Sequence, residues 1–168
     1  MTRILVLAFG VCFGLAACTE PPIIAPVTSG SAEVAAPSTG PVFTNELNQR
    51  GLKAINDLRA ANRRSALRFS PTLGRVARAH AADMRRRNVM SHTGGGGSTP
   101  AQRATRVGYS WCRIAENVAA GQPDLASVMQ AWANSPGHRR NMLDLNITEV
   151  GIAQDGPYWA MVLGKPGC

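Results

Sequence analysis

Hydrophobic residues in the first half of the domain recur every three to four positions, the spacing of an amphipathic helix. Residues 44–62 follow this period and predict a first helix. A second helix starts after Ser70-Pro71, an N-cap followed by proline at the first helical position, and its apolar positions run from Leu73 to Met84. Three shorter helices are predicted over residues 99–108, 125–132 and 135–143.

The later part of the chain changes to strand-like patterns. Residues 115–120 form a short apolar run, and residues 149–154 and 158–163 flank the turn sequence Asp155-Gly156-Pro157, which predicts a terminal β-hairpin. Four consecutive glycines at 94–97 predict a flexible loop. Helices mixed with a few late strands indicate an α+β fold and not a repeat of βαβ units.

The N-terminus reads as an export signal. Residues 4–17 are an apolar run after Arg3 and fall short of the roughly 20 residues that a membrane-spanning helix needs. Small residues precede Cys18, the pattern that lipoprotein signal peptidase recognises, so residues 1–17 are predicted to be removed and Cys18 to carry lipid. The alternative is an ordinary signal peptide cleaved nearby, with Cys18 incidental.

Residues 18–41 are predicted to form a disordered tether, because prolines interrupt a run of alanine, serine, threonine and valine without any period. The globular domain then covers residues 42–168. Thr19 instead of aspartate after Cys18 favours delivery to the outer membrane in a bacterium with two membranes. In a bacterium with one membrane, the lipid would hold the domain at the cell surface.

The four cysteines have different predicted fates that follow from their positions in the chain. Cys12 leaves with the signal peptide and Cys18 carries lipid, so Cys112 and Cys168 remain in an oxidising compartment. An even remainder predicts one disulfide between them. Two free thiols or a metal-binding pair are the alternatives, although no C-x-x-C spacing supports a metal.

The chain is basic, with a net charge of +8 that comes almost wholly from 16 arginines against 2 lysines. A cationic envelope protein would be attracted to anionic lipid or to cell-envelope glycans. Arginine-rich solvated faces without any partner explain the same composition. The exported location and the lack of aromatic residues among the basic runs argue against nucleic acid, and we expect a monomer.

Six segments in order resemble the CAP (SCP) family, which comprises cysteine-rich secretory proteins, antigen 5 and pathogenesis-related proteins. They are residues 54–59, 77–84, 90–94 with Ser91-His92, 115–121 with Glu116-Asn117, 131–143 with Ser135-Pro136-Gly137-His138-Arg139, and 148–153. The resemblance covers nearly all of residues 42–168. It implies a three-layer α-β-α sandwich with a central antiparallel sheet.

The resemblance also implies a cleft lined by a His/Glu tetrad, which here is His92, Glu116, Ser135 and His138. Many animal members have a second glutamate where this chain has Ser135, so one carboxylate of the family pattern is missing. Arg139 and Arg140 directly follow His138 and are expected to rim the cleft, where they could hold an anionic ligand.

The residues themselves support a cluster at this point. His92 and His138 stand beside glycine, serine and proline, in loops or at helix ends that are exposed and can converge. Two imidazoles and the Glu116 carboxylate suit Zn²⁺ or another divalent metal, and a hydrogen-bonded polar cluster is the alternative. His80 lies on the apolar stripe of its helix and is expected in the core.

We expect a non-enzymatic binding module whose cleft holds a lipid, a glycan or a partner protein. The alternative is a metal-assisted hydrolase or peptidase in which Glu116 acts as base and a zinc on His92 and His138 activates water. A serine hydrolase is disfavoured, since the chain has no G-x-S-x-G motif and Ser135 reads first as an N-cap.

Overall fold

The computed structural model describes residues 45–168. The predicted signal peptide, the lipid-modified Cys18 and the tether all lie outside the described residues. Within the described part, no helix is both long and apolar enough to cross a membrane.

Five α-helices, one short 3₁₀ turn and four strands make up the described part of the chain. In order they are α1 (Asn45–Ala61), β1 (Arg68–Phe69), α2 (Pro71–Arg87), η1 (Gly95–Gly97), α3 (Pro100–Arg106), β2 (Trp111–Ala120), α4 (Leu125–Asn134), α5 (Pro136–Met142), β3 (Glu149–Asp155) and β4 (Tyr158–Pro166). All five predicted helices are present. The strand predicted at 115–120 starts four residues earlier, and the 94–97 loop contains the 3₁₀ turn.

The sheet has the order β1-β3-β4-β2, which leaves β2 at one edge. The three long strands are antiparallel, as expected. The short β1 pairs with β3 in parallel, so the sheet as a whole is mixed and not purely antiparallel. Two residues cannot show an alternating pattern, which is why the sequence did not predict β1.

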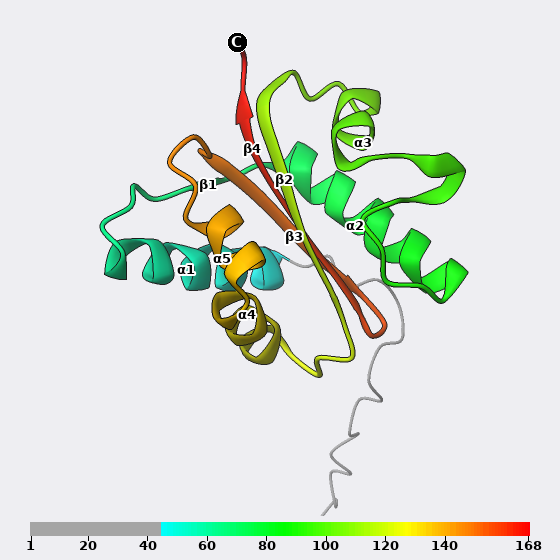
Figure 1. Cartoon of the computed structure of the whole chain (residues 1–168), viewed down its shortest axis with the longest axis horizontal. Coiled ribbons are helices and arrows are strands. Elements are labelled where there is room, and N and C mark those ends of the chain that lie inside the picture. Colours follow the sequence, from blue (N-terminus) through cyan, green and yellow to red (C-terminus); the bar gives the residue numbers. More distant parts are fainter. Residues whose placement is uncertain (1–44) are drawn as a thin grey trace, which may run out of the picture. The chain divides into compact units, whose positions relative to one another are not determined.

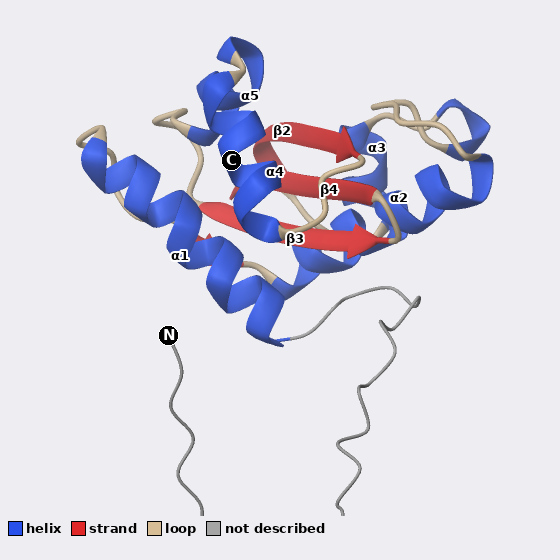
Figure 2. Cartoon of the chain, turned by 90° about the horizontal axis from the view of Figure 1, so that it is seen from below, coloured by secondary structure: helices blue, strands red, loops and turns tan. Residues whose placement is uncertain are grey.

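The sheet lies between two layers of helices, with α2 and α3 on one face and α1, α4 and α5 on the other (Figures 1 and 2). β4 is the middle one of the three long strands, and its side chains alternate between the two cores. Trp159, Met161 and Leu163 pack toward α1 and α4, whereas Ala160 and Val162 pack toward α2. The expected three-layer sandwich is therefore confirmed.

The backbone of α2 lies against β3 where two glycines meet. A Cβ atom on Gly151 would lie 2.2 Å from the backbone nitrogen of Gly74, a distance that no real contact allows. Both positions are buried. The absence of side chains at this crossing lets the helix approach the sheet at backbone distance.

Side chains that cap or bridge backbone groups fix the ends of several elements. Ser70 caps α2, and Thr99 and Gln102 form the predicted capping box of α3. The Asn56 amide bonds both the N–H and the C=O of Leu67. These contacts hold α1 to the strand that follows and fix where α2 and α3 begin.

The predicted disulfide between Cys112 and Cys168 is present, with Cα atoms 5.2 Å apart. It joins the start of β2 to the segment after β4, across a separation of 56 residues. Because β2 and β4 are hydrogen-bonded neighbours, the cross-link closes one end of that strand pair.

Candidate functional site

Glu116 is the centre of a buried polar cluster on the edge strand β2. Its neighbour two positions on, Val118, packs into the core beneath α2, so the alternation of the strand directs Glu116 to the same face. Its side chain is 1% exposed. His92 Nδ1 lies 2.9 Å from one carboxylate oxygen, and Arg103 Nη2 donates to the other at 2.6 Å. Both oxygens therefore have a partner.

His92 lies in the loop after α2, which turns away from the helix at Asn88 in a left-handed conformation. Its side chain is 55% exposed, although Nδ1 reaches the buried Glu116. When Nδ1–H donates to the carboxylate, a neutral imidazole has its lone pair on Nε2. Glu116 therefore fixes the ring orientation and leaves Nε2 as the acceptor.

Arg103 on α3 holds this loop in place, although it was not among the predicted site residues. Besides Glu116, its guanidinium donates to the carbonyl oxygen of Ser98 at 2.6 Å and to that of His92 at 3.1 Å. Its side chain is 9% exposed. In the sequence Arg103 is one arginine among many, and the only local signal is its position next to Ala104 on the buried side of a short capped helix.

His80 on α2 is fully buried, as expected for the apolar stripe, but it also belongs to the cluster. Its Nε2 lies 2.8 Å from the carbonyl oxygen of Ser91 and 3.6 Å from Glu116 Oε1. Burial lowers the pKa of His80; the Glu116 charge opposes this shift, and the Arg103 charge adds to it. His80 is thus neutral at pH 7 and supports the loop that carries His92.

His138 approaches the same edge of the sheet from the other face, on α5. Asn117, which follows Glu116 and points to the opposite side, donates to the His138 carbonyl oxygen at 3.2 Å. The Asn141 amide bonds Asn117 at 2.9 Å and the Glu116 carbonyl oxygen at 3.2 Å. These two amides join α5 to β2 and fix the position of His138 relative to Glu116.

The pKa of His138 is lowered, first by burial and then by the charge of His92. Both causes favour the neutral form of the His138 imidazole.

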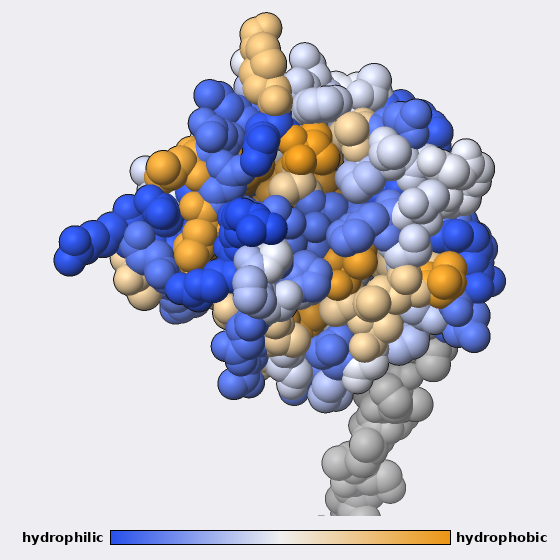
Figure 3. Space-filling model, viewed as in Figure 1, coloured by the Kyte–Doolittle hydropathy of each residue, from blue (hydrophilic) through white to orange (hydrophobic). Residues whose placement is uncertain are grey.

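A groove of about 260 Å³ runs beside the ring of His138, and we call it the His138 groove. It is lined by Met90, Val118, Ala119, Ala120, Gln122, Ala131, Trp132, Ser135 and His138. In Figure 3, apolar atoms gather beside the lower half of β2 with hydrophilic atoms around them. The lining contains two of the four predicted tetrad residues, Ser135 and His138, whereas Glu116 lies beneath the surface.

The remaining predicted site residues are Ser135, Arg139 and Arg140, which lie at the start of α5 or on it. Ser135 stands at the N-cap position of α5, but its hydroxyl makes no capping bond. Arg139 donates to Asn62 Oδ1 at 2.8 Å, so its guanidinium is engaged with the turn after α1. Arg140 is exposed on α5.

The donor set does not match a usual zinc centre. Zinc sites use three or four protein ligands, and both Glu116 oxygens already have partners, which leaves the imidazoles of His92 and His138. Among residues 45–168, no group of three or more histidine, cysteine, aspartate or glutamate side chains could hold a metal. A metal on the two histidines stays a prediction, and we derive no chemical step through it.

Comparison with known proteins gives consistent matches. The model of the cysteine-rich secretory protein (CAP) family matches residues 52–155. A curated relative, the uncharacterized protein YkwD of Bacillus subtilis, is 29% identical over 131 residues, which are 76% of this chain and 51% of that protein. An uncharacterized protein of Borreliella burgdorferi is 30% identical over 58% of this chain and 61% of its own length.

Two solved structures agree with the fold at 26% sequence identity. One is an extracellular SCP-domain protein from Bacillus anthracis, with a TM-score of 0.69 over 72% of this chain and 41% of that chain. The other is an outer surface protein from Borrelia burgdorferi, with a TM-score of 0.68 over 76% of this chain and 99% of that chain. The chain spans about half the length of the Bacillus proteins it matches.

Proposed function

Since the chain belongs to the CAP family of cysteine-rich secretory proteins, we propose that it is an extracytoplasmic binding module. Its ligand would lie in the His138 groove and would be held there without chemical change. The observation that carries this proposal is the state of Glu116, the single acidic side chain at the site.

A general base must reach the proton that it removes, either directly or through one water. Glu116 is 1% exposed, and His92 and Arg103 occupy its two oxygens. Using Glu116 as base would require breaking one of these contacts in a buried site. This arrangement supports a positioning role, in which Glu116 orients the His92 ring, over the hydrolase alternative.

The lining of the groove favours a lipid among the three expected ligand classes. Met90, Val118 and Ala131 provide an apolar wall, whereas Ser135 and His138 provide hydrogen-bonding groups at the same hollow. A ligand with an apolar part next to a polar head satisfies both. A glycan would leave the apolar wall without a matching partner.

We further propose that the module is exported and anchored by lipid on Cys18. The Cys112–Cys168 disulfide supports an oxidising compartment. The matched structures include a protein described as extracellular and one described as an outer surface protein. Incorporation of labelled palmitate by the full chain, and its loss in Cys18→Ser, would test the anchor.

Binding can be tested with a fluorescent short-chain phosphatidylglycerol and the purified full chain. Ala131 is exposed and lines the groove, so Ala131→Phe should fill the hollow and weaken probe binding at least tenfold. Gln130→Phe, an exposed neighbour on α4 that does not line the groove, is the matched control and should bind as the wild type does.

The recovered probe distinguishes the two functions. Intact lipid after long incubation, with binding lost only in Ala131→Phe, supports the binding module. If the wild type cleaves the probe and His92→Ala does not, the hydrolase function would be correct and the binding-module proposal would be wrong. Absence of probe binding, together with retention on purified peptidoglycan, would overturn the lipid assignment in favour of a glycan.

A further inference from the structure

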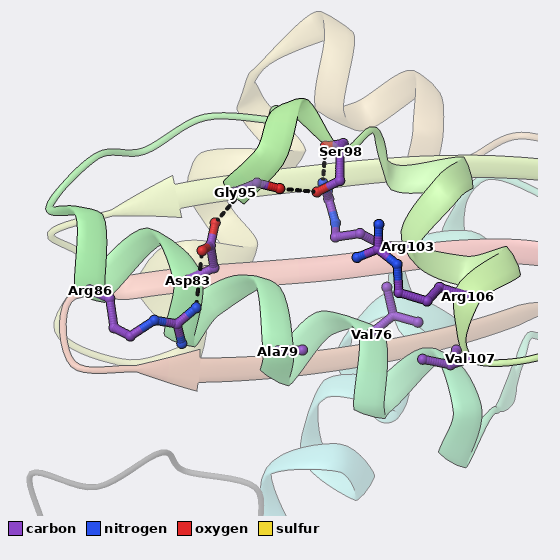
Figure 4. Close-up of a pocket in the computed structure, with 9 residues that line it drawn as sticks. All are labelled: Val76, Ala79, Asp83, Arg86, Gly95, Ser98, Arg103, Arg106 and Val107. Atoms are coloured by element: carbon purple, nitrogen blue, oxygen red, sulfur yellow. Dashed lines mark hydrogen bonds and ion pairs between the residues drawn. The ribbon is translucent and has the colours of Figure 1, made fainter.

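A second and larger hollow lies between α2 and α3, and Arg103 is one of the residues that line it. Its volume is about 370 Å³, within the range of small-molecule sites. Figure 4 shows Val76, Ala79 and Asp83 on α2, Gly95 and Ser98 in the loop above, and Arg103 and Arg106 on α3. None of these residues lines the His138 groove.

The charge around this cavity is mainly positive. Arg86, Arg103 and Arg106 line it together with a single acidic residue, Asp83. Asp83 is already compensated: the Gly95 N–H donates to it at 2.9 Å, and Arg86 and Arg87 bond it at 3.0 and 2.9 Å. Burial raises the pKa of Asp83, but these contacts outweigh burial and lower it overall.

Arg106 and Arg103 differ in how many of their N–H donors the protein already uses. Arg106 makes no side-chain hydrogen bond or ion pair with any residue in the described range 45–168. Arg103 is more than nine-tenths buried, and its Nε has no hydrogen-bond partner. A buried unpaired guanidinium nitrogen is costly, and Arg106 has no partner among the described residues, so this part of the protein does not fully satisfy the two arginines that α3 places at the cavity.

We propose that this cavity is a binding site for a phosphate monoester with an apolar substituent. The phosphate would contact Arg106 and Arg103, and the substituent would pack on Val76, Ala79 and Val107. The site is separate from the His138 groove, and the proposal does not rest on the function proposed above.

Charge and geometry favour a phosphate over a carboxylate. A phosphate monoester carries a charge of about −1.5 to −2 at pH 7, which suits a cavity where Arg106 has no ion pair within residues 45–168 and where Arg86 and Arg103, each bound to one carboxylate, still have N–H groups to share. Guanidinium groups bind phosphate through paired hydrogen bonds. The apolar wall of valine and alanine gives an organic phosphate an advantage over inorganic phosphate.

A ligand in the cavity would also alter the contact between Arg103 and Glu116. Arg103 Nη2 bonds the Glu116 carboxylate, whereas Nε of the same planar group is the unpaired donor. A ligand that contacts Arg103 in the cavity therefore acts on the group that holds both the carboxylate and the His92 loop. We expect the His92 ring signals to shift when the cavity fills.

The test uses the full chain and phenyl phosphate, followed by calorimetry and by the amide NMR signals of Gly95 and Ser98. Arg106→Gln should weaken binding at least fivefold, and Arg63→Gln, an exposed arginine in the turn after α1, should not. Ala79→Phe keeps every charge but fills the cavity, and should abolish the Gly95 and Ser98 shifts. Ala60→Phe, exposed on α1, is its control.

The source of the phosphate is resolved by a second probe, phosphatidylcholine vesicles that contain phosphatidate. Binding of phenyl phosphate that depends on Arg106 and Ala79 supports the site and indicates a soluble organic phosphate. Vesicle binding alone with the same dependence supports the site and indicates a lipid headgroup. No binding of either probe, or equal losses in the Arg63 and Ala60 controls, would overturn the proposal.

Discussion

Removing Arg103 should destabilise the fold strongly, because it leaves the Glu116 carboxylate buried without its cation. Breaking a buried ion pair from one side costs about 3–5 kcal/mol. In Arg103→Met the carbonyl oxygens of Ser98 and His92 also lose a donor. We therefore expect the free energy of unfolding to fall by about 3–5 kcal/mol at about pH 8.

The loss should be smaller in mild acid, because His80 can replace part of the missing charge. In the wild type, burial and the Arg103 charge lower the pKa of His80, while Glu116 and Asp83 raise it. Without Arg103 one lowering cause is gone, so the pKa rises and a protonated His80 can pair with Glu116. The difference between variant and wild type should therefore shrink from about pH 8 to pH 5.

Urea unfolding followed by tryptophan fluorescence provides the measurement, since Trp132 and Trp159 are each 1% exposed. Arg113→Met is the matched control: it removes an ion pair with Asp144 whose arginine is 57% exposed, and should cost less than about 1 kcal/mol. The variant with both Arg103→Met and Glu116→Gln should be more stable than Arg103→Met alone. A loss below about 1 kcal/mol at both pH values would refute the reasoning.

Three other changes test the remaining structural claims. Gly151→Ala places a methyl group against the backbone of α2 and should lower the free energy of unfolding, measured in urea, by about 3 kcal/mol or more. Gly137→Ala is the control: it has open space around it, so its free energy of unfolding should be unchanged or higher. Replacing Cys112 and Cys168 by serine should lower stability by about 4 kcal/mol; an unchanged midpoint would show that the reduced chain is already constrained. The pKa of His138 is lowered, so its contribution to stability is complete above about pH 6.5 and declines as the pH falls. His138→Gln should make the stability of the domain less dependent on pH in this range. An NMR titration that gives His138 a pKa at or above about 6.5 would contradict this prediction.

The sequence predicted what depends on short-range patterns. The periods in α1 and α2, the Ser70-Pro71 start and the Thr99–Gln102 capping box act within a few residues, so the chain itself reveals them. The hairpin of β3 and β4 follows from a turn sequence between two apolar runs. β1 was missed, because its two residues form a strand only by pairing with Glu149 and Val150.

The candidate site could be predicted only in part. Family resemblance identified His92 and Glu116, which lie in contact. It did not identify Arg103 and His80, which reach Glu116 from helices 13 and 36 positions away in the sequence. Their role depends on how two helices pack on the edge strand, and local sequence does not carry that information.

The cross-link has a consequence for the order of assembly. Cys168 follows β4, so its thiol reaches Cys112 only after every strand of the sheet has been synthesised. A sheet that pairs as soon as β4 is available forms without covalent help, and the bond then locks a structure that already exists. Its effect should be greatest on how long the folded domain survives and least on how fast it first forms.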